Sequence, residues 1–119
     1  MRMSSFLEKF AAYGGDADGV MDRFMEDEEL LMTCLNQFVD ADEMEVLKDD
    51  IEKKDYKHAF ETAHALKGVT GNLGLTPLYD TVCVLVESLR AGIYDHVDEQ
   101  FNAVEEKRKE FVVAYEQMK

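Results

Sequence analysis

The chain has one proline and seven glycines among its 119 residues, so few positions interrupt regular secondary structure. Its composition is rich in Ala, Leu, Glu, Lys and Met, which favour helices. The sequence contains no apolar run near the roughly 20 residues that a membrane span needs. Glu8 and Lys9 interrupt the stretch where a secretory signal would be apolar. We therefore expect an all-α cytoplasmic protein without a membrane partner.

Positive charge is scarce, because 13 Lys and Arg face 26 Asp and Glu for a net charge of −13. This acidity argues against nucleic acid as a partner, since proteins bind the phosphates of DNA and RNA with basic surfaces. Hydrophobic residues make up 46% of the chain, which is enough for a core and argues against disorder. The length fits a single domain over residues 1–119.

Two cysteines are too few for the disulfide framework of a small secreted domain. Cys34 and Cys83 both lie in apolar helical stretches. We expect two buried thiols in a reducing compartment.

The N-terminal 26 residues are expected to form a helical cap. A first helix over residues 4–13 ends at Gly14 and Gly15, and Asp16 or Asp18 can cap a short second helix.

Four longer amphipathic helices follow, with apolar residues at spacings of three and four. Asp55 and Asp95 are expected helix starts, as is Thr76 followed by a proline, while Gly74 and Gly92 are expected stops. The expected ranges are 27–54, with a kink or turn at 40–42, then 55–73, 76–91 and 95–118. Short turns between them predict an antiparallel up-down-up-down four-helix bundle over residues 27–118.

His64 points away from the apolar side of its helix. At about 100° per residue, the apolar arc of this helix lies about 140–260° from His64. Seven residues form that arc: Ala59, Thr62, Ala63, Leu66, Val69, Thr70 and Leu73. His64 is therefore expected on the surface.

Gly68 and Gly71 share the outward face with His64, and each costs about 1 kcal/mol of helix stability relative to Ala. Core packing does not account for glycines on this face. We interpret them as positions without a side chain, which let a partner backbone or a phosphoryl group approach the imidazole closely. Lys67 adds an ammonium group on the same face. A neutral imidazole is a competent nucleophile near pH 7. The combination favours acceptance of a phosphoryl group.

Residues 64–74 read HALKGVTGNLG and resemble the signature of histidine-containing phosphotransfer (HPt) domains. The signature has a His, a Lys three residues later, a Gly four residues later, and then Asn-Leu-Gly. The resemblance covers nearly the whole chain and is closest to the compact stand-alone form. Val69 stands where Ser or Ala is frequent and Gly71 where Ala is usual, which bears on partner fit.

The resemblance implies a carrier in a multistep phosphorelay, without kinase activity of its own. His64 would accept a phosphoryl group from the aspartate of one receiver domain and pass it to another, and Lys67 would neutralise the phosphoryl oxygens. Gly68 and Gly71 would admit the receiver. The chain would need no metal or cofactor, since Mg²⁺ belongs to the receiver, and it is expected to be a monomer. The expected receiver contacts are Lys57, Phe60, Glu61, Lys67, Gly68, Gly71 and Asn72.

Several residue roles stay open at this point. Phe60 on the outward face is either a receiver contact or partly buried against another helix. Lys57 either steers an acidic receiver or is an ordinary solvated lysine. His58 is interpreted as a histidine at the core boundary without a role. The acidic residues between Asp40 and Asp55 are interpreted as a solvated face.

Three alternative functions compete with the relay. A phosphorylation-silent adaptor would hold a receiver on the same surface, although it would be expected to lose His64. The chain could be a module excised from a hybrid or chemotaxis-type kinase, although the start at Met1 and a last helix ending near Lys119 favour a free-standing protein. A di-iron carboxylate bundle would use Glu61 and His64, but it requires a second such pair.

Overall fold

The computed structural model describes residues 4–119 and is all-helical in that range, which confirms the expected fold class. Seven helices follow one another along the described residues. They are α1 (Ser5–Tyr13), α2 (Ala17–Arg23), α3 (Glu28–Asp40), α4 (Glu43–Glu52), α5 (Tyr56–Asn72), α6 (Thr76–Ala91) and α7 (Val97–Met118).

Most helix ends coincide with the expected capping residues. The side chains of Ser4, Asp16, Asp27 and Asp55 each accept a hydrogen bond from a backbone N–H in the first turn of the helix that follows. The expected turn at residues 40–42 is also confirmed, since α3 ends there and α4 begins at Glu43.

The expected start of α6 at Thr76 is confirmed, whereas the expected start of α7 at Asp95 was wrong by two residues, since that helix begins at Val97. Leu75, and not Thr76, is the N-cap of α6, so that Pro77 falls within the first helical turn. His96, and not Asp95, is the N-cap of α7. Neither helix has a side-chain hydrogen bond at its cap, so their starts depend on packing rather than on a capping side chain.

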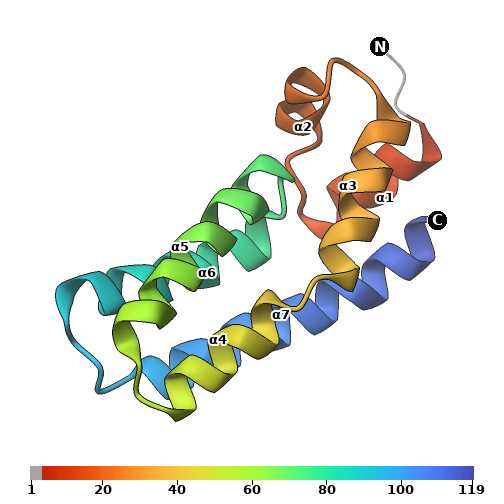
Figure 1. Cartoon of the computed structure of the whole chain (residues 1–119). Helices are drawn as coiled ribbons and strands as arrows, with labels where there is room; N and C mark the ends of the chain where they lie inside the picture. Colours follow the sequence, from red (N-terminus) through yellow and green to blue (C-terminus); the bar gives the residue numbers. More distant parts are fainter. Residues whose placement is uncertain (1–3) are drawn as a thin grey trace.

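The helices α4, α5, α6 and α7 each pack against the next one in the chain, and α4 also contacts α7. Figure 1 shows α5 beside α6 at one end of an elongated molecule, whose extents are 47 × 22 × 20 Å. The 22 residues of α7 span about 33 Å at 1.5 Å per residue. This helix contacts α4 and α6 and also reaches α1.

The C-terminal half of α7 holds α1 and α3. The rings of Phe111 and Phe38 pack edge to face with centroids 6.0 Å apart, and the ring of Tyr13 in α1 packs against Phe111 with centroids 5.4 Å apart. The Tyr115 hydroxyl lies 2.7 Å from Asn36 Oδ1, and Arg108 donates to the Val39 carbonyl at 2.9 Å. The division into a cap over 1–26 and a bundle over 27–118 stays a prediction.

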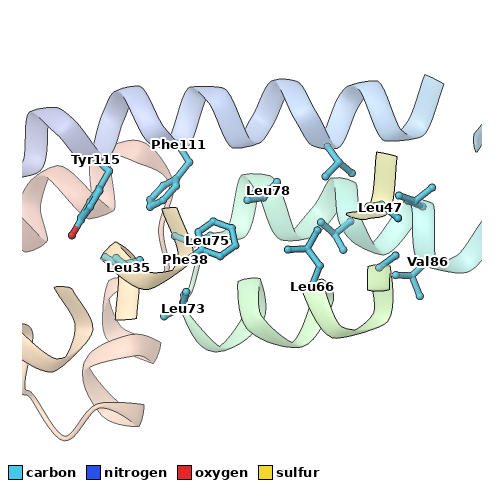
Figure 2. Close-up of a cluster of buried hydrophobic side chains, with 14 of the residues drawn as sticks. Leu35, Phe38, Leu47, Leu66, Leu73, Leu75, Leu78, Val86, Phe111 and Tyr115 are labelled. Carbon is cyan, nitrogen blue, oxygen red and sulfur yellow. The ribbon is translucent and has the colours of Figure 1, made fainter. Parts of the chain in front are cut away.

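One continuous core fills the space between α7 and the helices that face it, as Figure 2 shows. The expected inner face of α5 is confirmed, since Ala59, Ala63, Leu66 and Thr70 are buried. The buried Thr70 hydroxyl donates to the Leu66 carbonyl at 2.9 Å, so its polar group is satisfied. Burial of this face sets the rotation of α5 and turns His64 outward.

The structure corrects two interpretations of burial. Asp50, which was expected on a solvated acidic face, is buried with 7% of its surface exposed. Cys34 and Cys83 are half-buried free thiols and not fully buried. Among residues 4–119, no helix is both long enough and apolar enough to cross a membrane.

Candidate functional site

His64 opens into a shallow hollow of about 290 Å³ on the outward face of α5. The ring is exposed, and the hollow is also lined by Lys67, Gly68, Gly71, Asn72 and, from α6, Tyr79. The structure thus brings together five of the residues that the sequence singled out. The hollow places an exposed imidazole, an ammonium group and bare backbone on one surface.

The two glycines differ in their surroundings. A β-carbon built on Gly68 would have no neighbour within 4 Å, so this position is open space. A β-carbon on Gly71 would lie 3.2 Å from Tyr79 Cε2, which is a tight contact. Neither glycine contacts the core, but the Tyr79 ring from α6 lies close to the Gly71 backbone, so Gly71 has a local packing role that Gly68 lacks.

Phe60 is half-buried and lies between His64 and a cation. Its ring centroid is 5.7 Å from the His64 ring, and the guanidinium carbon of Arg90 lies 5.3 Å from the Phe60 centroid. Of the two interpretations left open for Phe60, the structure shows partial burial beneath α6. Sequence reasoning missed Arg90, since no local pattern links the last turn of α6 to Phe60, which lies 30 positions earlier in α5.

Tyr79, in α6, lies against Gly71 of α5 and is one turn before Cys83 on its own helix. The side chain of Cys83, one turn along α6, raises the pKa of the Tyr79 hydroxyl above its usual value. In the hollow, Tyr79 acts as a neutral packing group against Gly71.

The side chain of Arg23, in α2, contacts the last turn of α5. Its Nε donates to the Asn72 carbonyl at 3.0 Å and its Nη2 donates to the Gly71 carbonyl at 3.1 Å. The Gly71 carbonyl also accepts a bond from the Gly74 N–H, so Arg23 adds a second donor there, and its positive charge complements the negative end of the helix dipole. The sequence offered no signal for this contact, because it joins residues 49 positions apart.

The remaining expected contact residues lie outside the hollow. Glu61 and Lys57 are exposed on α5, about one and two turns respectively before the hollow begins at His64. Glu61 and His64 both face solvent, so they do not form the inward-facing pair of a di-iron bundle. Within residues 4–119, no group of three or more His, Cys, Asp or Glu side chains is arranged to hold a metal ion.

His58, interpreted from sequence as having no role, is instead a structural residue. Its Nδ1 lies 2.6 Å from Oδ2 of the buried Asp50, which also accepts a weaker hydrogen bond from Thr62 at 3.4 Å. The hydrogen bond to Asp50 and the charge of that carboxylate raise the pKa of His58. The contact joins α4 to α5 and satisfies a carboxylate that would otherwise be buried without a partner.

Four cations surround α5 in a chain whose net charge is −13. Lys57 and Lys67 belong to α5 itself. Arg23 and Arg90 reach it from α2 and α6. Arg90 also pairs with Glu87 at 3.5 Å, and Glu61 is exposed on α5. Among the residues that line the hollow, Lys67 carries the formal charge, and this positive charge suits an acidic partner.

Comparison with known families agrees with this geometry. The family model described as "Hpt domain" matches residues 25–111, which include all of α5 and the hollow except for Arg23 at its edge. No curated protein and no solved structure gives a significant match. The match covers well over half of the chain, and so the protein belongs to the Hpt domain family, whose members are histidine phosphotransfer carriers of two-component signalling.

Proposed function

We propose that His64 is the phosphoryl carrier of a multistep phosphorelay, accepting the group from a receiver-domain aspartate and passing it to a second receiver. The observation that carries this proposal is the exposed His64 ring in one hollow with Lys67 and the open Gly68 position. An inert surface histidine would not require a helix-weakening glycine one turn away.

The transfer step follows from the chemistry of an aspartyl phosphate. The lone pair of a neutral His64 nitrogen attacks phosphorus, so a P–N bond forms while the P–O bond to the aspartate breaks. The electron pair of the broken bond leaves with the receiver carboxylate. The other ring nitrogen of His64 keeps its proton. Passage to the second receiver reverses the step, with a new carboxylate as the nucleophile.

Lys67 and Gly68 serve this step in different ways. The Lys67 ammonium group offsets the charge on the phosphoryl oxygens as the group moves between carboxylate and imidazole. Gly68 leaves the approach free, since no side chain stands between the receiver and the ring. Lys57, Phe60, Glu61, Gly71 and Asn72 complete the proposed contact surface.

The chain acts in this scheme as a carrier and not as an enzyme, and the receiver supplies the Mg²⁺ and the acidic pocket. We further propose that residues 27–118 form the antiparallel up-down-up-down bundle, that residues 1–26 cap it, and that the protein works as a cytoplasmic monomer. The consecutive packing of α4, α5, α6 and α7 supports the bundle.

The direct test is incubation with a phosphorylated receiver domain, followed by mass spectrometry at neutral or alkaline pH. We expect the mass of one phosphoryl group on His64. The His64→Gln variant should gain none while retaining the helical circular dichroism spectrum, and His96→Gln, which alters another exposed histidine, should be phosphorylated normally.

Two other results would contradict the proposal. A receiver that binds the protein tightly but leaves no phosphoryl group on it, while phosphorylating another HPt protein, would make the chain a phosphorylation-silent adaptor. Phosphorylation at a residue other than His64 would move the site.

A further inference from the structure

The segment that precedes the Hpt-matching region is bound to the helix that carries the site. The family match begins at residue 25, after α2. The Asp16 N–H donates to the Gly74 carbonyl at 2.9 Å, and a β-carbon on Gly74 would overlap Val20 of α2. Gly74 adopts a φ of +66°, which glycine tolerates in this turn, and its lack of a β-carbon leaves room for Val20. The end of α5 is thus built against α2.

Arg23 is placed to do more than close the end of α5. Its two hydrogen bonds to Gly71 and Asn72 use one N–H of Nε and one of Nη2. A guanidinium group carries five N–H donors, so three remain. Arg23 is exposed, and both of its acceptors line the His64 hollow. Its unused donors therefore lie at the edge of the hollow and in solvent.

The distance from His64 to this edge lies within the reach of one protein partner. Eight residues separate His64 from Asn72, which is about 12 Å along the helix axis at 1.5 Å per residue. A standard interface covers about 800 Å² on each partner, equivalent to a disc of about 16 Å radius. A receiver centred on His64 would therefore cover Arg23 as well.

We propose that Arg23 is a receiver-binding residue, which donates hydrogen bonds from its free guanidinium nitrogens to a carboxylate or carbonyl group of the receiver. The inference rests on the proposed phosphotransfer function and adds a partner contact from α2, outside the family-matching region. Its two carbonyl bonds hold the guanidinium in place before the receiver arrives, which lowers the entropic cost of the new contact.

The experiment compares receiver association with the wild-type protein and with Arg23→Gln, Arg23→Lys and Lys109→Gln. The receiver is the domain that phosphorylates His64 in the transfer assay, used unphosphorylated in stopped-flow or surface-binding measurements at several salt concentrations. Lys109 is exposed on α7, which carries none of the residues lining the hollow, and so its variant controls for the loss of one positive charge.

We expect Arg23→Gln to weaken receiver binding about three- to tenfold at low salt, with the deficit shrinking as salt rises, because a charged contact at an interface rim acts through association rate and screening. Arg23→Lys should restore most of the association rate. Lys109→Gln should bind like the wild type. Thermal unfolding followed by circular dichroism shows whether each variant remains folded.

Binding of Arg23→Gln that equals Lys109→Gln at every salt concentration would overturn the inference and leave the carrier function intact. A deficit that does not change with salt would also overturn it, because loss of positioning alone would not depend on screening. If the wild-type protein accepts no phosphoryl group from any receiver, the proposed function itself fails, and the inference falls with it.

Discussion

His58 and His64 lie on the same helix and are both exposed, yet the structure gives them different chemistry. Half of the His58 side chain is accessible, but its Nδ1 is 2.6 Å from a buried carboxylate. His64 packs beside the Phe60 ring and has no hydrogen bond to its own ring within the described residues 4–119. Exposure alone therefore does not separate a structural histidine from a candidate nucleophile.

The difference lies in the partner of each ring. Asp50 favours the protonated form of His58 by raising its pKa, and a protonated imidazole lacks the lone pair that attacks phosphorus. His64 has no carboxylate partner in the described structure, and bare backbone lies one turn away at Gly68. A free ring and a clear approach distinguish the candidate carrier from its neighbour on the helix.

The largest expected effect is on phosphoryl acceptance by the two histidine variants. His64→Gln should abolish phosphorylation, because no ring nitrogen remains to form the P–N bond. His58→Gln should be phosphorylated at the wild-type rate, since its ring contacts α4 and not the hollow. Receiver-dependent labelling followed by mass spectrometry measures both. Equal loss in the two variants would mean that His58 belongs to the site.

The next largest effect is expected at Gly68. Gly68→Gln should reduce transfer about 10²-fold, the scale associated with displacing reacting groups by about 1 Å. The same change should stabilise α5 by about 0.5–1 kcal/mol, because Gln favours helix more than Gly. The matched control is Gly68→Ala, whose β-carbon meets open space. It should stabilise the helix and retain transfer; undiminished transfer by the Gln variant would refute the steric role.

Lys67→Ala is expected to slow transfer about tenfold without abolishing it. Removal of a preorganised donor in an enclosed site costs about 10²–10³ in rate, and Lys67 is half-exposed, so solvent screens part of its effect. Single-turnover transfer kinetics measure the rate, and Lys109→Ala on α7, away from the proposed contact surface, serves as the control for lost charge. An unchanged rate would remove Lys67 from the mechanism.

The smallest expected effect is on protein stability, and it tests the structural role of His58. Its raised pKa means that the stabilisation is fully present below about pH 6.5 and is lost as pH rises through the raised folded-state pKa. The unfolding free energy of the wild type should fall in that range. Urea unfolding at a series of pH values measures this decrease. His58→Gln should flatten the profile, whereas His96→Gln should preserve it.

Sequence periodicity was sufficient to orient α5, because one side of that helix is apolar and must be buried. The caps at Asp16 and Asp55 were predictable, since an Asp side chain at a helix start satisfies backbone N–H groups locally. Leu75 and His96 were not predictable as caps, because neither of them makes a side-chain bond to its helix. Local hydrogen bonding thus explains the helix starts at Asp16 and Asp55, whereas packing decides those at Leu75 and His96.

The residues of the candidate site also fall into two groups: those that helical periodicity predicts and those that only packing between helices places. His64, Lys67 and Gly68 are neighbours on one helical turn, so their common face follows from the helical repeat. Tyr79, Arg90 and Arg23 come from other helices, and their positions depend on how α6 and α2 pack against α5. The tight contact of Tyr79 with Gly71 could not be deduced from the spacing of α5 alone.

The sequence by itself determined an all-helical chain, the outward direction of His64 and the residues on the same turn, because these follow from interactions between residues a few positions apart. Tertiary structure alone decided which histidine is held by a carboxylate, which glycine is open, and which cations border the hollow. Those outcomes depend on contacts between helices distant in sequence, whose distances are set by core packing and not by helical periodicity.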